Sequence, residues 1–161
     1  KVPISKLINQ GESQTLEFKE TLEYDTQNKA QNKAKNKDIL LSSLKTIAGF
    51  LNAAGGTLLI GVDDSGKTKG IEQDLTMMKH DNNDRFEQKI RNCLRDRFKP
   101  QPIGKVNVSF GKLSGGTICR VDIQAHEDII RLDDKVYLRE GNTTLRLEGQ
   151  TLTGWTEKRR R

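Results

Sequence analysis

Two short segments of the chain have the apolar patterns of β-strands. Leu16 and Phe18 alternate with Glu17 and Lys19, which predicts a half-buried strand with the charged pair on its open face. The run from Thr57 to Val62 is continuously apolar, as is typical of a strand in the centre of a sheet. The sequence therefore predicts one strand with a polar face and one that is buried.

Apolar residues at helical spacing predict two amphipathic helices. The first is expected from a cap at Asp38 to about Leu51, and Gly55-Gly56 suits its end. The second is expected over Asp84 to Phe98, after which two prolines stop it. The apolar stripe of the first helix consists of Leu40, Leu41, Leu44, Ile47, Ala48 and Leu51.

Alternating patterns in the second half of the chain predict further strands. Val106 to Phe110 and Cys119 to Ile123 are expected to pair as a hairpin. Two shorter strands are expected over 128–132 and 135–139, and 140–144 has the composition of a loop. Strands in runs with two inserted helices favour an α+β fold with a mixed β-sheet over a regular βαβ alternation.

The length of the chain, 161 residues, fits a single domain spanning 1–161. Within it, the near-repeat from Thr26 to Asp38 has little to bury and is expected to be a polar basic loop, with a solvated linker favoured over a phosphate contact. Residues 156–161 are expected to form a basic tail.

The net charge of +6 favours a polyanionic partner, nucleic acid above all. No run approaches the roughly 18 apolar residues of a membrane span, and the first residues lack the layout of a signal peptide. Cys93 and Cys119 lie in apolar patterns, which favours small buried side chains over a disulfide. We therefore expect an intracellular, cytoplasmic protein without a membrane partner.

Acidic residues stand beside both predicted strands. Glu17 and Lys19 lie on the same side of one strand, an arrangement that metal-dependent nucleases use to hold a divalent cation. Asp63-Asp64 follow the buried strand, where loops commonly build sites. Glu12 can join them only if Ser13-Gln14 bends the chain, because five extended residues span roughly 16 Å. The alternative is that Glu12 and Glu17 form ordinary surface ion pairs with Lys19 or Arg139.

Residues 61–68 match the phosphate-loop pattern G-x-x-x-x-G-K-[ST]. Two carboxylates in that loop would repel a phosphate, and the residues after it do not start a convincing helix, so the amide cradle is missing. ATP binding is therefore less favoured than a simple β-turn.

Three blocks of sequence, in order, resemble the Schlafen-type AlbA domain. They are Gly11–Lys19, Ala48–Gly66 with Gly70-Ile71, and Val136–Leu147, and the resemblance runs from about Ile8 to Leu147. It implies a single AlbA-like lobe that binds nucleic acid. In the vertebrate Schlafen core this lobe is a ribonuclease that acts on structured RNA such as tRNA.

The resemblance also implies site residues. Glu12, Glu17 and Asp64 would hold Mg²⁺ or Mn²⁺, and Lys19 would stabilise charge in the transition state. No zinc site is expected, because the chain lacks the His and adjacent Cys ligands of the Schlafen core. The remaining residues of these types, whose spacing does not suit a metal, are Cys93, Cys119, His80 and His126.

The sequence favours RNA as the bound nucleic acid and leaves DNA open. Aromatic residues make up only 5% of the chain, which favours recognition of shape and backbone over base stacking. A homodimer would rebuild the groove that two lobes form in the Schlafen core. The alternative function is a non-catalytic DNA- or RNA-binding regulatory module. The cations expected to contact the nucleic-acid backbone are Lys89, Arg91, Arg95, Arg139, Lys158, Arg159 and Arg160.

Overall fold

The fold is built on a four-stranded mixed sheet with the strand order β1-β2-β5-β4, in a computed structural model that describes residues 1–27, 30, 32–79 and 82–160. The strands are β1 (Leu16–Lys19), β2 (Gly56–Ile60), β4 (Val106–Leu113) and β5 (Gly116–Ile123). β1 pairs with β2 in parallel, and the β2–β5 and β4–β5 pairs are antiparallel. The expected α+β class, the mixed sheet and the β4–β5 hairpin are confirmed.

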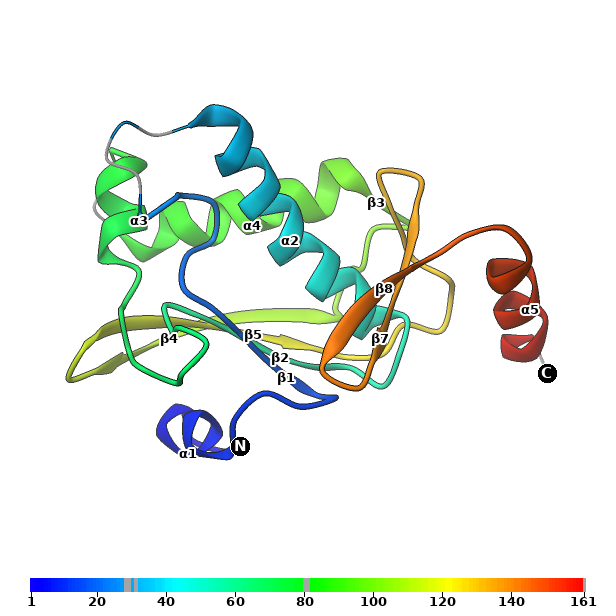
Figure 1. Cartoon of the computed structure of the whole chain (residues 1–161), viewed down its shortest axis with the longest axis horizontal. Coiled ribbons are helices and arrows are strands. Elements are labelled where there is room, and N and C mark those ends of the chain that lie inside the picture. The colour runs from blue at the N-terminus through cyan, green and yellow to red at the C-terminus, as the bar shows by residue number, and fades with distance from the viewer. Residues whose placement is uncertain (28–29, 31, 80–81, 161) are drawn as a thin grey trace.

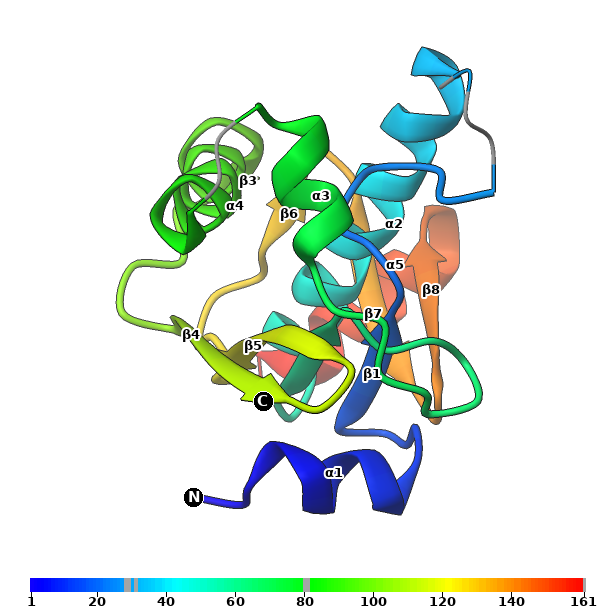
Figure 2. The same ribbon diagram turned by 90° about the vertical axis from the view of Figure 1, so that its left-hand side faces the viewer.

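Helices cover both faces of this sheet (Figures 1 and 2). α2 (Lys33–Leu51), α3 (Glu72–Met77) and α4 (Asn83–Arg97) lie on one face, over the main hydrophobic core. α1 (Ile4–Gln10) lies on the other, over a smaller core. α2 and α4 are the two main helices that the sequence predicts, whereas α1 and α3 are short and were not expected.

The polar face of β1 is covered by other elements, and the expectation of an open face is wrong. Leu16 and Phe18 point into the smaller core beneath α1. Because side chains alternate along a strand, Glu17 and Lys19 must point to the α2 side, where Lys19 Nζ donates to Ser42 Oγ at 2.8 Å. Both charged side chains are largely buried, with 13% of Glu17 and 23% of Lys19 exposed.

α2 begins earlier than the sequence predicted. Asn32 caps the helix, because its side-chain oxygen accepts hydrogen bonds from the amides of Ala34 and Lys35. The expected loop over 26–38 is therefore wrong from Lys33 onward, and Asp38 lies within the helix rather than at its cap. Residues 28, 29 and 31 of that loop lie outside the described residues.

The second half of the chain adds two strand pairs beside the helices. β3 (Phe98–Lys99) pairs with β6 (Arg131–Leu132), and β7 (Val136–Glu140) forms a hairpin with β8 (Thr143–Leu147). The segment 140–144, expected to be a loop, contains the turn of this hairpin and the start of β8. The hairpin packs against the C-terminal half of α2, and this contact places Arg139 beside β1.

The basic tail is largely helical. α5 (Gly149–Arg159) includes residues 156–159 of the expected basic tail, and the last residue, 161, lies outside the described residues. Arg159 donates hydrogen bonds to the backbone carbonyls of Asn52, at 2.8 Å, and His126. Its guanidinium therefore docks α5 against the end of α2, and Lys158 and Arg160 remain exposed.

Both cysteines are free and buried, as predicted. Burial raises the pKa of the Cys93 and Cys119 thiols, so both are held in the unreactive neutral form. No helix in the described part of the chain is both long and apolar enough to cross a membrane.

Asp74 in α3 gives the fold a pH dependence that a single substitution should remove. Burial, and then the charge of Glu23, raise the pKa of Asp74 to about 7, while an N–H donated by Leu22 opposes the shift. The folded protein therefore keeps a proton that the unfolded chain releases near pH 4, so this group costs nothing below pH 4 and destabilises the fold increasingly as the pH rises to 7.

We expect Asp74→Asn to stabilise the protein at pH 8 by a few kcal/mol, with about 4 kcal/mol as the upper bound, and to have little effect near pH 4. Urea unfolding at both pH values measures this difference. The matched control is Asp38→Asn, at an exposed position, and its change in the free energy of unfolding should be the same at both pH values. A destabilised Asp74→Asn protein at pH 8 would contradict the assignment.

Candidate functional site

The C-terminal ends of β1 and β2 meet at one edge of the sheet, because the two strands run in parallel. Lys19 lies opposite Ile60 in the register, and the amides of Gly61 and Val62 both donate to the Lys19 carbonyl. The chain leaves β2 at this edge and continues into Asp63 and Asp64. Carboxylates from two separate segments of the sequence are thereby brought to the same place.

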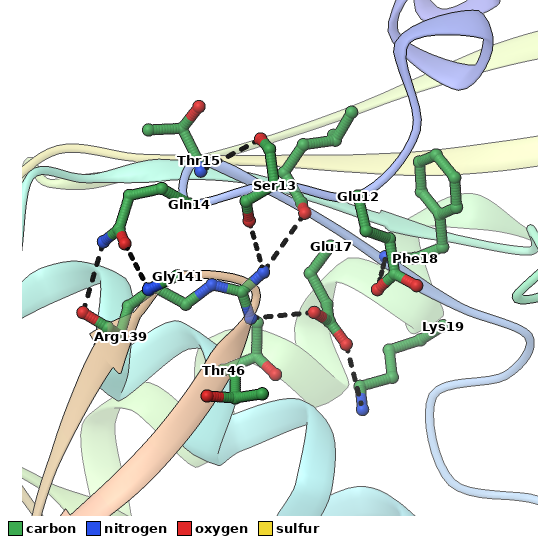
Figure 3. A network of polar contacts seen from close by, with 12 residues as sticks. Glu12, Ser13, Gln14, Thr15, Glu17, Phe18, Lys19, Thr46, Arg139 and Gly141 are labelled. Carbon is green, nitrogen blue, oxygen red and sulfur yellow. Dashed lines mark hydrogen bonds and ion pairs between the residues drawn. The ribbon is translucent and has the colours of Figure 1, made fainter.

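Glu12 joins this edge because the chain turns back on itself after it. Ser13 and Leu16 form an isolated β-bridge around the turn at Gln14-Thr15. The Glu12 carboxylate then accepts a hydrogen bond from the amide of Phe18 at 3.3 Å. The bend that the sequence analysis required is confirmed, and Figure 3 shows the carboxylates of Glu12 and Glu17 side by side.

Burial and two neighbouring carboxylates perturb the pKa of Glu12. Burial is the largest cause that raises its pKa, followed by a hydrogen bond with Glu17, and the negative charges of Glu17 and Asp64 raise it further. The amide of Phe18 opposes the shift. We call Glu12, Glu17 and Asp64 the acidic site, because the three carboxylates interact although Asp64 is distant in sequence.

The two neighbouring aspartates after β2 have different roles. Asp63 Oδ1 accepts hydrogen bonds from the amides of Ser65 and Lys67 and from the Ser65 hydroxyl. These contacts lower the pKa of Asp63, and the hydrogen bond from the Ser65 side chain has the largest effect. The Asp63 carboxylate is therefore used to stabilise the turn. Asp64 is exposed and forms no hydrogen bond or ion pair with any described side chain. Its carboxylate is therefore free to turn toward a ligand.

A cation held by all three carboxylates of the acidic site would require the Asp64 side chain to rotate toward Glu12 and Glu17. Among the described residues, the set with three ligand atoms mutually within 4.8 Å is His126, Glu127 and Asp128. That set is consecutive in sequence, and His126 Nδ1 already accepts the amide of Asp128, so nothing beyond proximity marks it as a site. His80, the other histidine, lies outside the described residues.

Lys19 links the acidic site to a neighbouring pocket. Its ammonium lies 3.5 Å from Glu17 Oε2 and is held by Ser42 of α2. A pocket of about 280 Å³ opens beside it between α2 and the segment after β1, and Lys35 lies on its wall. Neither Lys35 nor Ser42 was among the predicted site residues, because Lys35 lies in the segment expected to be a loop and Ser42 lies within the predicted helix but off its apolar stripe. Their helical spacing with Ile39 and Thr46 was an available signal.

Arg139 is buried inside the fold rather than on a nucleic-acid surface. Its side chain is 1% exposed, and its NH1 lies 2.8 Å from Glu17 Oε1. The predicted phosphate contact is therefore wrong for this residue, since a phosphodiester cannot reach it. The alternative that Glu17 pairs with Lys19 and Arg139 is confirmed, although the pair with Arg139 is buried and not at the surface.

The other predicted cations do not gather around the acidic site. Arg91 on α4 donates to the carbonyl of Val106 at the start of β4, which is the edge of the sheet opposite β1. Lys89 and Arg95, also on α4, form ion pairs with Glu23 and Asp96. Arg159 is used to dock α5, as described above. A single basic trough lined by all of these residues is not present among the described residues.

The phosphate-loop match is a hairpin-like turn. Val62 bridges Thr68, and the Asp63 carboxylate occupies the amides of Ser65 and Lys67. The next helix, α3, begins only at Glu72. Because the loop's amides are used and no helix follows Thr68 directly, the geometry contradicts ATP binding through this loop.

Comparisons with known proteins agree with this geometry. A model of the family described as "Schlafen, AlbA_2" matches residues 12–148. The crystal structure of the DIP2311 protein from Corynebacterium diphtheriae is similar with a TM-score of 0.60 and 20% identity, over 91% of this chain and 24% of that chain. The N-terminal domain of a candidate ATP-dependent DNA helicase RecG-related protein from Nitrosomonas europaea has a TM-score of 0.51 and 18% identity, over 78% of this chain and 74% of that chain. No curated protein matches the sequence.

The two solved structures are evidence for the fold alone, because sequence identities of 18% and 20% are too low to support a shared function. The chain spans about a quarter of the DIP2311 protein. The family match is broader evidence, since it covers most of the chain and includes every residue of the acidic site together with Lys19 and Arg139. The chain belongs to the Schlafen AlbA_2 family.

Proposed function

We propose that this domain binds nucleic acid and cleaves structured RNA, such as tRNA, with the help of a divalent cation. The observation that carries the proposal is the acidic site, where three carboxylates from two segments interact at one edge of the sheet. Burial, and then the neighbouring Glu17 and Asp64 carboxylates, raise the pKa of Glu12 there. Crowded carboxylates of this kind are costly unless a cation offsets their repulsion. The neighbouring pocket, whose lining includes Lys19 and Lys35 together with Glu20 and Asp25, offers two cations to a phosphodiester beside the site.

The donor set suits Mg²⁺ or Mn²⁺, because both prefer carboxylate oxygen. Glu12, Glu17 and Asp64 would hold the ion, and Asp64 has the freedom to complete the set. When bound, such an ion supplies charge neutralisation at the scissile phosphate and lowers the pKa of a coordinated water.

Lys19 has a separate task in the proposed reaction. Its ammonium is held by Ser42 and Glu17, so its position is fixed before substrate binds. A preorganised cation stabilises developing negative charge on the phosphate without the cost of reorganisation. The Lys35 Nζ atom lies 3.8 Å from Asp25 Oδ2 on the pocket wall, and it would contact the RNA backbone beyond the cleaved bond.

The second candidate is a non-catalytic DNA- or RNA-binding module in which the acids only order the fold. The ion pairs of Glu17 with Lys19 and Arg139 favour it, because they give Glu17 a structural role. The RecG-related protein carries its similar domain at the N-terminus, which is compatible with a binding module.

The experiment that separates the candidates is incubation of purified protein with tRNA and with single- and double-stranded DNA, in Mn²⁺ or in EDTA. We expect tRNA cleavage in Mn²⁺ and none in EDTA. We also expect RNA binding in EDTA to weaken as salt rises, with a log–log slope of about −0.7 for each single-strand phosphate contacted. Binding without cleavage would favour the module. If the protein neither binds nor cleaves these nucleic acids, both candidates are rejected.

A further inference from the structure

We propose that Arg139 is the positioning residue of the acidic site. It holds the Gln14-Thr15 turn closed and fixes Glu17, so that the carboxylates of Glu12 and Glu17 face one space. This inference rests on the proposed function for its effect on catalysis. The geometry that supports it can be tested without any catalytic activity.

One guanidinium group binds both sides of the turn and the acid at once. Its NH1 donates to Glu17 Oε1 at 2.8 Å, and its NH2 donates to the carbonyls of Ser13 at 2.6 Å and Leu16 at 3.2 Å. Ser13 and Leu16 are the two residues that flank the turn. Figure 3 shows these three contacts converging on Arg139. Opening the turn would therefore break contacts to the residue that also orients Glu17.

The turn is what places Glu12 in the acidic site. Five extended residues would separate Glu12 from Glu17 by roughly 16 Å, so the closed turn decides whether the two carboxylates meet. Glu12 contributes its hydrogen bond from the Phe18 amide and its interaction with the Glu17 carboxylate. Arg139 supplies three hydrogen bonds, from a different part of the chain.

Arg139 is itself held from both sides. Gln14 donates to the Arg139 carbonyl at 3.2 Å and accepts from the amide of Gly141, which ties the turn to the β7–β8 hairpin. The guanidinium lies 5.0 Å from the centre of the Phe50 ring. At Gly49 of α2, a Cβ atom would lie only 3.2 Å from the Arg139 amide, so the hairpin sits close to the helix. The position of Arg139 is therefore fixed by packing on α2 and by the turn.

The chemistry of this position needs arginine. A guanidinium presents several donors in a fixed plane, and here NH1 reaches a carboxylate while NH2 reaches two carbonyls. A lysine has a compact charge and would reach Glu17 or the carbonyls, but not hold all three in one geometry. Because only 1% of its side chain is exposed, water does not compete for its donors.

The test compares Arg139→Lys and Arg139→Met with the matched control Arg146→Met, an exposed arginine of β8. Three quantities are measured: Mn²⁺ affinity by titration calorimetry, kcat and KM for tRNA cleavage, and RNA affinity in EDTA at several salt concentrations. We expect both Arg139 variants to lose about 10- to 100-fold in Mn²⁺ affinity or kcat, with Lys the milder. RNA affinity in EDTA should keep its salt slope, whereas loss of a phosphate contact would reduce that slope by about 0.7.

A metal-free measurement separates this inference from the proposed function. Hydrogen exchange of the Phe18 amide reports whether Glu12 folds back onto β1, and it should accelerate in Arg139→Lys but not in Arg146→Met. If the wild-type protein neither binds Mn²⁺ nor cleaves RNA, the proposed function fails while the exchange experiment still decides the positioning role. Unchanged Phe18 exchange in Arg139→Lys would overturn it.

Should the Arg139 variants fail to fold, Gln14→Ala provides the milder change. It keeps the guanidinium and removes only the link between the turn and the hairpin. We expect faster Phe18 exchange and weaker Mn²⁺ binding than in the wild type, and wild-type values for both would count against the inference.

Discussion

The variant Asp64→Ala is expected to lose at least about 100-fold in the rate of Mn²⁺-dependent RNA cleavage while keeping its stability within about 0.5 kcal/mol of the wild type. The reason is that Asp64 is exposed and has no hydrogen bond or ion pair with described residues, although its charge acts on Glu12. Removing it should therefore remove a cation ligand without disturbing packing. Single-turnover cleavage of tRNA and urea unfolding of the same preparation measure the two effects.

The neighbouring variant Asp63→Ala is the matched control. Asp63 accepts three hydrogen bonds within its own turn, so its loss should lower the stability of the protein measurably and leave cleavage near the wild-type rate. The two variants thus predict opposite patterns from adjacent residues. Loss of cleavage in Asp63→Ala with retention in Asp64→Ala would show that the wrong aspartate has been assigned to the acidic site.

The variant Glu17→Ala should destabilise the protein by about 3–5 kcal/mol, because it leaves the buried guanidinium of Arg139 without its counter-ion. Replacing Arg139 by Met in the same chain removes the unpaired charge. We therefore expect the double variant to be more stable than the sum of the two single losses indicates, by about 1–3 kcal/mol. Urea unfolding of the four proteins of this double-mutant cycle gives the coupling free energy.

Exposed Glu140→Ala serves as the reference in that experiment. Glu140 follows Arg139 on β7 but points to solvent, and its loss should change stability by no more than about 0.5 kcal/mol. Additive losses in the Glu17–Arg139 cycle would mean that the two groups do not depend on each other, and would also weaken the positioning role of Arg139.

Local patterns in the sequence predicted the sheet strands and the two main helices of the core, whereas the acids of the candidate site came from the family resemblance. Alternation at Leu16 and Phe18 and the continuous run at Thr57 to Val62 reflect burial, and burial is what decides these strands. The family resemblance then selected Glu12, Glu17 and Asp64. The need for a bend after Glu12 followed from chain geometry alone, and the structure contains that bend.

What the sequence could not reveal depends on contacts between distant segments. Whether the charged face of β1 is open or covered depends on the contact of Lys19 with Ser42 of α2 and that of Glu17 with Arg139 of the β7–β8 hairpin. These partners lie 23 and 122 residues apart along the chain. The role of Arg139 was misjudged for the same reason, because charge alone suggests a surface group. The start of α2 was missed because its first turns are polar, so that the Asn32 cap and the helical spacing of Lys35 with Ile39 were the signals for it.

The hydrogen bond from the Phe18 amide to Glu12 also affects how the molecule meets its neighbours. β1 is the last strand on its side of the sheet, and unpaired amides on such a strand invite pairing with strands of other molecules. By occupying an outward amide with a charged side chain, Glu12 discourages that kind of self-association. A variant that lacks the Glu12 carboxylate is therefore expected to self-associate more readily in concentrated solution, independently of any effect on catalysis.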